Sequence, residues 1–395
     1  MLQYQTLSDR HSPKPYTLNS YLIFIAPALF LMPLTDEQRT AAICREINAI
    51  SQTYKAQRPW TQYQNALGLG IFAVSIAAIV WAMYGYCIGT WSAWVAMLWI
   101  AFWTSILHEL EHDLIHQLYF KSRPFWHNLM LAGVWLFRPL TLNPWMRRYI
   151  HYHHHKYSGT ASDIEERGLN NGMAWGFLRL ITTADLLLAG ALRSRKMRTE
   201  VRQLYQEGCY TPAEVRNLRR ITLYGFLPLG IPLHFVWYSF LLYYAFAGFG
   251  VLGQLWGGAS LSVAWASALA SMPLGWQHYT AAITPLVVLL IAPNMWRQFC
   301  LHFITSNMHY YGDVERGNIV QQAQVLNAWW LTPLQLFCFN FGSTHTIHHF
   351  VVNDPFYLRQ LIAAPAHKVL QRYGVRFNDM GTFFRANRYM GSKPA

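Results

Sequence analysis

Two long stretches of this 395-residue chain carry no charged side chain. They are residues 59–107 and 221–296, and both are rich in aliphatic and aromatic residues. A helix needs about 20 apolar residues to cross a bilayer, so the first stretch has room for two spans and the second for two or three. The pattern predicts an all-α integral membrane protein with about four transmembrane helices. The predicted spans are Ala66–Cys87, Trp91–Leu107, Ile221–Phe246 and Tyr279–Trp296.

The polar segments between and after these spans predict a helical cap beside the membrane. They are residues 120–220 and the part of the chain after Arg297, and no low-complexity linker separates them. We therefore expect a single domain over residues 1–395. A shorter apolar run, Tyr21–Leu34, cannot cross a bilayer and lacks a small-residue cleavage site, which favours an interfacial or re-entrant helix over a signal peptide.

Composition and charge agree with a membrane protein. Hydrophobic residues make up 53% of the chain and charged residues only 12%, about half the charged share of a typical soluble domain. The net charge is +13, but the connections Gly85–Thr90 and Ala247–His278 contain no Lys or Arg, which crowd the polar segments instead. By the positive-inside rule the polar segments face the cytoplasm, and we expect no nucleic-acid partner.

Three histidine motifs lie in or beside the polar segments. Residues at i, i+3 and i+4 share one face of an α-helix, so each motif would direct its imidazoles to one side. Neutral imidazole is the commonest nitrogen ligand of transition metals, and three such faces predict a polynuclear metal site. His153 would lie on the opposite side of its helix, either exposed or behind the ligands. The motifs are His108/His112/His116, His151/His154/His155 and His345/His348/His349.

A single metal site requires all three motifs on one side of the membrane. Gly248–Met272 is apolar and long enough to form a fifth span, which would place the last motif across the membrane from the other two. We therefore predict an even number of crossings between residues 221 and 296, with Gly248–Met272 shallow or re-entrant.

The motifs resemble the three histidine boxes of membrane fatty acid desaturases. The resemblance runs from about His108 to Asp354, and the stretch Phe120-Lys121-Ser122-Arg123 resembles bacterial members. That superfamily also contains alkane monooxygenases, acyl hydroxylases and alkene-forming fatty acid decarboxylases. The boxes read His112-Asp113-x-x-His116, Arg148-x-x-His151-x-x-His154-His155 and His345-x-x-His348-His349.

The resemblance implies two iron ions held by nine histidines. One of them, in His309-Tyr310-Tyr311-Gly312, has one tyrosine more than the usual His-Tyr-Gly context. His108 with His112 fits the first box as well as His112 with His116 does, although the downstream Phe-Lys-Ser-Arg favours the second pair. Zinc would be saturated by four ligands and has no redox chemistry. The implied ligands are His112, His116, His151, His154, His155, His309, His345, His348 and His349.

Carboxylates near the boxes can accept an imidazole N–H and so fix the orientation of the ring. We expect this role of Asp113 and Asp163. The ordinary interpretation of such carboxylates is a solvated charge, and it applies to Glu109, Glu111, Glu165, Asp313 and Asp354.

The implied reaction is the O2-dependent oxidation of an unactivated C–H bond in a fatty acyl chain that enters from the membrane lipid. The sequence has no iron–sulfur or haem signature, so an external electron donor is required. A basic cytoplasmic face suits an acidic ferredoxin, working with its reductase. The resemblance to bacterial members places the protein in the bacterial inner membrane, with the boxes on the cytoplasmic side.

Desaturation is the most populous reaction of the superfamily and is our prediction. Hydroxylation of a fatty acid, its decarboxylation to an alkene and hydroxylation of an alkane remain alternatives. A histidine-lined metal transporter is a distant one, because transporters place ionisable residues at mid-membrane on broken helices.

Overall fold

The computed structural model describes residues 34–390, and these residues form helices and loops without a β-strand. This confirms the all-α class. From Asp36 onward the chain forms one compact unit. Residues 21–33 of the predicted N-terminal interfacial segment lie outside the described residues.

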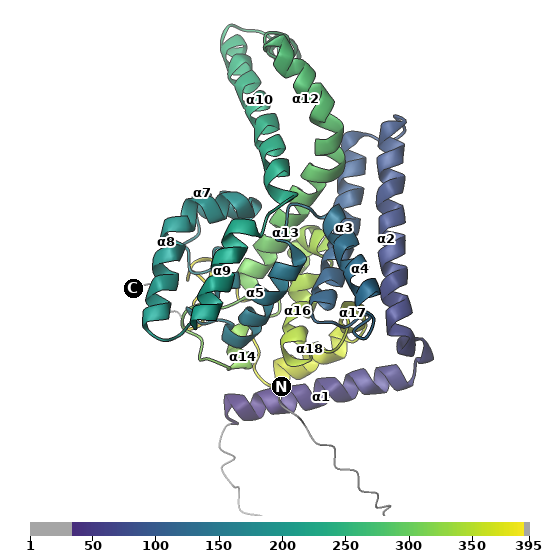
Figure 1. Cartoon of the computed structure of the whole chain (residues 1–395), viewed down its shortest axis with the longest axis vertical. Coiled ribbons are helices and arrows are strands. Elements are labelled where there is room, and N and C mark those ends of the chain that lie inside the picture. Colours follow the sequence, from purple (N-terminus) through teal and green to yellow (C-terminus); the bar gives the residue numbers. More distant parts are fainter. Residues whose placement is uncertain (1–33, 391–395) are drawn as a thin grey trace, which may run out of the picture. The chain divides into compact units, whose positions relative to one another are not determined.

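Within residues 34–390, four helical segments are long and apolar enough to cross a membrane, as predicted. They are Pro59–Cys87, Ala93–Ile115, Gly230–Trp256 and Leu274–Met308. The first comprises a 3-10 turn and α2 (Gln64–Cys87), the second is α3 and the third α10. The fourth comprises α12 (Leu274–Leu286), a π turn (Val287–Ile291) and α13 (Ala292–Met308). Figure 1 shows α2 with α3 and α10 with α12 as two hairpins.

Three of these helical segments run past the predicted span ends, and α10 does so by extending from Phe246 to Trp256. α3 continues from Leu107 to Ile115, and the last segment continues from Trp296 to Met308. The sequence prediction ended both spans just before the first charged residues, but the added part of α3 is buried. The third span also begins later than predicted: α9 ends at Tyr224, the chain turns at residues 225–229, and α10 starts at Gly230. The turn contains Pro228, which cannot continue a helix.

The segment Gly248–Met272 does not form a span of its own. Residues 248–256 belong to α10, so the prediction of a shallow segment was wrong for them. The following helix, α11 (Leu261–Ala270), is too short to cross a bilayer and folds back along α10, where Gln254 Nε2 donates to Ser267 Oγ at 2.9 Å. The number of long helices after residue 221 is therefore even, as the single-site argument required.

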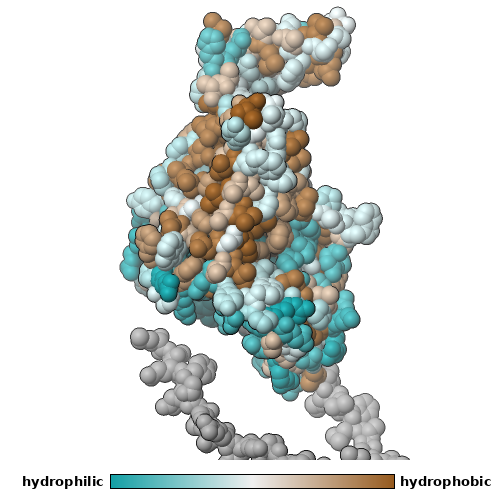
Figure 2. All heavy atoms as spheres, turned by 90° about the vertical axis from the view of Figure 1, so that its right-hand side faces the viewer, coloured by the Kyte–Doolittle hydropathy of each residue, from teal (hydrophilic) through white to brown (hydrophobic). Residues whose placement is uncertain are grey.

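Large apolar side chains are exposed over the long helices and over α4 (Pro124–Phe137). Trp94 is 71% exposed and Phe125 70% exposed. Figure 2 shows hydrophobic residues over the middle of this face and hydrophilic residues at its lower end. An apolar surface of this extent is unfavourable in water, so the band fits the hydrocarbon region of a bilayer.

The remaining helices form the predicted helical cap. α1 (Asp36–Ala56) packs against α16 and α18, and Ile43 and Ile47 of α1 share a buried cluster with Ile347 of α16. Figure 1 shows α1 lying across the lower end of the unit, away from the hairpin of α10 and α12. The other cap helices are α5 (Pro144–Tyr157), α6 (Ile164–Gly168), α7 (Phe177–Ala184), α8 (Leu186–Gln206), α9 (Pro212–Tyr224), α14 (Ile319–Gln322), α15 (Thr332–Gln335), α16 (Phe341–Phe350), α17 (Phe356–Leu361) and α18 (Ala363–Arg372), with 3-10 turns at Trp329–Leu331, Leu336–Cys338 and Met380–Phe383.

Candidate metal centre

Four helices end close together, and each has a histidine in its last turn or at its C-cap. His116 caps the C-terminus of α3 and His309 caps that of α13. His155 lies in the last turn of α5, and His348 and His349 lie in the last turn of α16. The C-terminus of a helix carries partial negative charge. The convergence of four such ends favours a cation among these histidines.

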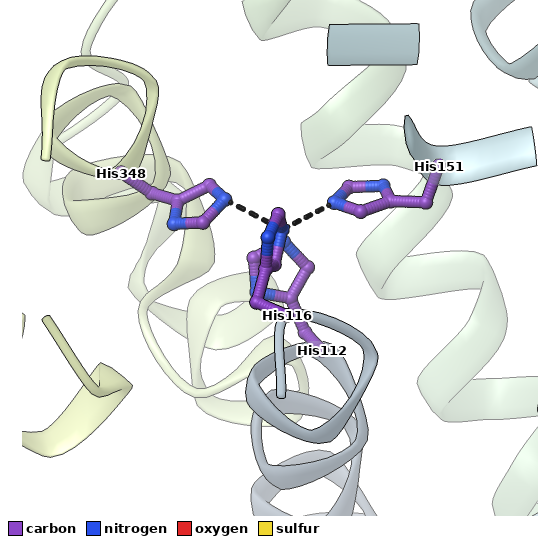
Figure 3. A group of neighbouring side chains, drawn as sticks. All are labelled: His112, His116, His151 and His348. Carbon is purple, nitrogen blue, oxygen red and sulfur yellow. Dashed lines mark hydrogen bonds between the residues drawn. The ribbon is translucent and has the colours of Figure 1, made fainter. Parts of the chain in front are cut away.

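The first histidine group consists of His112, His116, His151 and His348, whose ligand nitrogens lie within 4.8 Å of one another. Figure 3 shows their rings pointing toward a common centre. The Nε2 atom of His116 lies 2.9 Å from that of His151 and 3.0 Å from that of His348. His155 adjoins this group, because its Nε2 lies 3.2 Å from the Nε2 atoms of His116, His151 and His348.

The second histidine group consists of His154, His309, His345 and His349, all of them buried. The Nε2 atoms of His309 and His349 are 3.3 Å apart. The two groups are adjacent, since the ring centroids of His112 and His345 are 5.3 Å apart. The fold therefore brings all nine histidines of the predicted ligand set together.

Proton positions in the second group indicate that a cation fits there. The Nδ1–H of His309 donates to the carbonyl oxygen of Thr305 at 3.0 Å, and that of His349 donates to Oε1 of Gln322 at 3.1 Å. A neutral imidazole has one N–H, so both Nε2 atoms carry a lone pair. Two lone pairs facing each other at 3.3 Å repel unless a cation lies between them.

The first group leads to the same conclusion. The Nδ1–H of His151 donates to Oε2 of Glu165 at 2.9 Å, which leaves its Nε2 as an acceptor. The Nε2 of His116 is close to three other ring nitrogens, but it has at most one proton to donate. Both ring nitrogens of His112 are buried and lack a hydrogen-bond partner among the described residues. These donors fit a metal ion.

Three carboxylates on or beside the short helix α6 orient the imidazoles. Asp163 accepts from Nδ1 of His154 at 2.8 Å, which is the contact predicted for it. Glu165 faces His151, and Oε1 of Glu166 lies 3.2 Å from Nδ1 of His309. Such contacts fix the tautomer and make the other nitrogen a better ligand. Glu165 is thus not a solvated charge, and sequence reasoning missed Glu166, although it follows Asp163 within three residues.

The prediction that Asp113 accepts from an imidazole was wrong. Its carboxylate accepts from Nη2 of Arg359 at 3.1 Å, from the hydroxyl of Tyr119 at 3.0 Å and from the backbone N–H of Phe356 at 2.9 Å. Successive residues of a helix point about 100° apart, so Asp113 cannot share the side of α3 that His112 presents to the site. Asp113 instead ties α17 to α3.

Two further histidines lie outside both groups. Nδ1 of His108 accepts from Nη2 of Arg138 at 3.0 Å, which makes His112 and His116 the pair that joins the site. The ring of His153 packs against Tyr157 and Tyr210, with centroid distances of 4.5 and 5.3 Å. It belongs to neither group, in agreement with the helical-face argument. It is only 5% exposed, so of the two positions expected for it, exposed or behind the ligands, the exposed one was wrong.

The electrostatics of the cap favour neutral imidazoles at most of these positions. Burial lowers the pKa of His116 to about 2 and that of His309 to about 4. Burial also opposes a charge on His154, but the neighbouring Asp163 outweighs it and raises the pKa of His154 to about 10. Neutral imidazole is the form that binds metals, and at His154 a metal ion would compete with a proton for Nε2.

Comparison with known proteins gives a family for this arrangement. Residues 89–261 match the family model described as fatty acid desaturase, whereas no curated protein matches the chain. The matched segment contains the first two histidine motifs and ends before α13 and α16, which supply the remaining histidines. Together with the four apolar helices, the match identifies an integral membrane protein and a desaturase- or hydroxylase-like fatty acyl oxidase. The match over residues 89–261 supports the membrane-bound fatty acid desaturase superfamily, to which the histidine motifs also point.

Proposed function

We propose that this protein is an O2-dependent diiron oxidoreductase that desaturates a fatty acyl chain. The observation that carries the proposal is the pair of adjacent, largely buried histidine groups near the ends of four helices. One group would suffice for a zinc ion, which takes four ligands and does no redox chemistry. Two adjacent groups of nitrogen donors suit a pair of redox-active ions.

Each histidine group would hold one iron ion, with His155 as a further ligand beside the first group. Two iron ions bound in this way would supply the oxidation of a C–H bond by dioxygen. Four or five nitrogen donors do not fill an octahedral shell, so positions stay open for a co-substrate. Glu165 and Asp163 keep the Nδ1 protons of His151 and His154 away from the metal side, and the carbonyl oxygen of Thr305 does the same for His309.

The reaction needs electrons from outside the chain. Removing two hydrogen atoms from the acyl chain while one O2 becomes two water molecules consumes two further electrons and two protons. We propose a ferredoxin and its reductase as the source, docked on a basic cytoplasmic face of a bacterial inner membrane. The acyl chain would come from the bilayer, in which the exposed apolar side chains of the long helices are immersed.

Expression with a ferredoxin system in a host that makes ordinary fatty acids tests the reaction. We expect acyl chains two mass units lighter at unchanged carbon number, as measured by mass spectrometry, and no product without O2. Hydroxylated chains, or terminal alkenes one carbon shorter, would refute desaturation and leave the metal centre in place. Detergent-purified protein should carry two irons per chain, which a metal transporter need not retain.

Variants of two histidines on α5 connect this activity to the site. His154→Ala should lower the bound iron and abolish the product, because His154 belongs to the second group. His153→Gln is the matched control: its ring packs on tyrosines, so iron content and most of the activity should remain. Equal losses in both variants would contradict the assignment of the ligands.

A further inference from the structure

Arg297 on α13 is buried without a partner. Its side chain is 1% exposed, and none of its three guanidinium nitrogens has a hydrogen-bond partner among the described residues. A buried charge without a counter-charge is strongly unfavourable. A residue of this kind calls for a ligand or for another compensating group.

The surroundings of Arg297 are polar on one side of α13. Asn294, Arg297 and Gln298 share a helical face, and both polar atoms of the Gln298 amide are buried without a partner. Asn294 Nδ2 donates to the carbonyl oxygen of Phe137 at 2.9 Å, which brings this face against the end of α4, directly before Arg138.

The charged groups near this face leave a positive excess. Arg138 Nη1 lies 2.5 Å from Oε2 of Glu111, and Arg147 Nη1 lies 2.6 Å from Oε1 of the same carboxylate. Glu111 is therefore divided between two guanidinium groups, and its charge and theirs act on Arg297. Glu109, the carboxylate that precedes Glu111 on α3, is paired with Arg359: Oε2 of Glu109 lies 3.6 Å from Nη2 of Arg359.

Unpartnered guanidinium and amide donors form a receptor for a small anion. The guanidinium group is planar and matches a carboxylate with two parallel hydrogen bonds. Arg138 directly follows the end of α4 that Asn294 contacts; it is fully buried and contributes a second positive charge and an unpartnered Nε.

We propose that Arg297, assisted by Arg138 and the amide of Gln298, binds the carboxylate of a free fatty acid. The proposal rests on the proposed function and names the head group of its substrate: a free carboxylate instead of a thioester or a glycerol ester. Arg138 also donates to His108, one helical turn from His112 of the first histidine group. One turn is about 5 Å along the axis, so Arg138 reaches to within about one helical turn of the first histidine group, and the carboxyl end of the substrate would lie on the membrane side of the metal centre.

Ligand binding to the full-length, iron-loaded protein in detergent tests this site. We expect dodecanoate below its micellar concentration to bind by calorimetry and to raise the thermal unfolding midpoint, and methyl dodecanoate to do neither. Arg297→Met should weaken the binding of dodecanoate by roughly 10- to 100-fold, because a hydrogen bond to a charged group is lost. Arg297→Lys keeps the positive charge but lacks the planar guanidinium group. Its affinity for dodecanoate should lie between that of the unsubstituted protein and that of Arg297→Met.

The unfolding midpoint without ligand separates a binding role from a structural one. Arg297→Met removes an unpaired charge, so the midpoint should stay unchanged or rise. The control Arg193→Met removes a buried guanidinium group that donates to the backbone carbonyl oxygen of Arg167 and to Oδ1 of Asn170. This variant should have a lower unfolding midpoint but bind dodecanoate as before.

Three results would overturn the proposal: a lower midpoint for Arg297→Met without ligand, equal binding of acid and ester, or dodecanoate binding that Arg297→Met does not weaken. The last result would leave ordered water as the partner of Arg297. Binding is measured without turnover, so an acid that binds through Arg297 and is never oxidised would count against the proposed function alone. Oxidation that Arg297→Met leaves intact would count against the carboxylate site alone.

Discussion

At the scale of single residues, the two carboxylates expected to orient imidazoles separate into different roles. Asp163 accepts from His154, whereas Asp113 contacts no imidazole and binds Arg359, Tyr119 and Phe356 instead. Asp113 follows His112 directly in the sequence, but adjacency on a helix directs side chains apart. Asp163 follows the end of α5 after a turn of the chain, and this turn brings its carboxylate back to the ring of His154.

This difference predicts that replacing aspartate by asparagine changes a different property at each of the two positions. Asp163→Asn keeps an oxygen for the α6 cap but removes the negative charge from the Nδ1–H of His154, so iron affinity should fall about 10- to 100-fold. Asp113→Asn should keep the iron and lower the thermal unfolding midpoint, because it weakens the contact to Arg359. Iron per chain after dialysis against a graded chelator measures the first effect. Equal iron loss in both variants would show that Asp163 has no special role.

At the scale of helices, the charged end of α3 depends on partners from distant segments. Glu111 is fully buried between Arg138 and Arg147. Glu111→Gln leaves those two guanidinium groups without their carboxylate, and the loss of one partner from a buried ion pair costs about 3–5 kcal/mol. The unfolding midpoint in detergent should fall clearly. Glu46→Gln on α1 breaks an exposed pair with Arg372 and should leave the midpoint unchanged; similar shifts in both would contradict the burial argument.

The same helices show what the sequence could and could not reveal. The spacing of His151, His154 and His155 predicted a common face, because the geometry within one helix is local. The burial of the charged residues at the end of α3 could not be predicted from local spacing. The arginine partners that allow Glu109 and Glu111 to be buried follow them by 27 to 250 residues, and only the tertiary structure brings them together. For the same reason Glu166 and Gln322 were not recognised as partners of histidine.

At the scale of the whole molecule, the four long helices predict that native cysteines lie on opposite sides of the membrane. Cys87, at the end of α2, and Cys209, between α8 and α9, are both exposed. An impermeant maleimide should label Cys87 in spheroplasts and label Cys209 only after lysis. Cys87→Ser and Cys209→Ser identify the two signals. Labelling of Cys209 in intact spheroplasts would contradict the cytoplasmic placement of the cap.

The four helix ends that converge on the site come from widely separated parts of the chain, and this affects when the site can form. His345, His348 and His349 lie on α16, which follows all four long helices in the chain. Synthesis runs from the N-terminus, so the hairpins are inserted before the last proposed ligands exist, and metal binding would come at the end of biogenesis. Bound metal would then hold the last part of the chain to α3 and α5, because metal affinity adds to the stability of the folded state. The iron supply of the cell would thus set how much of the inserted protein reaches its finished form.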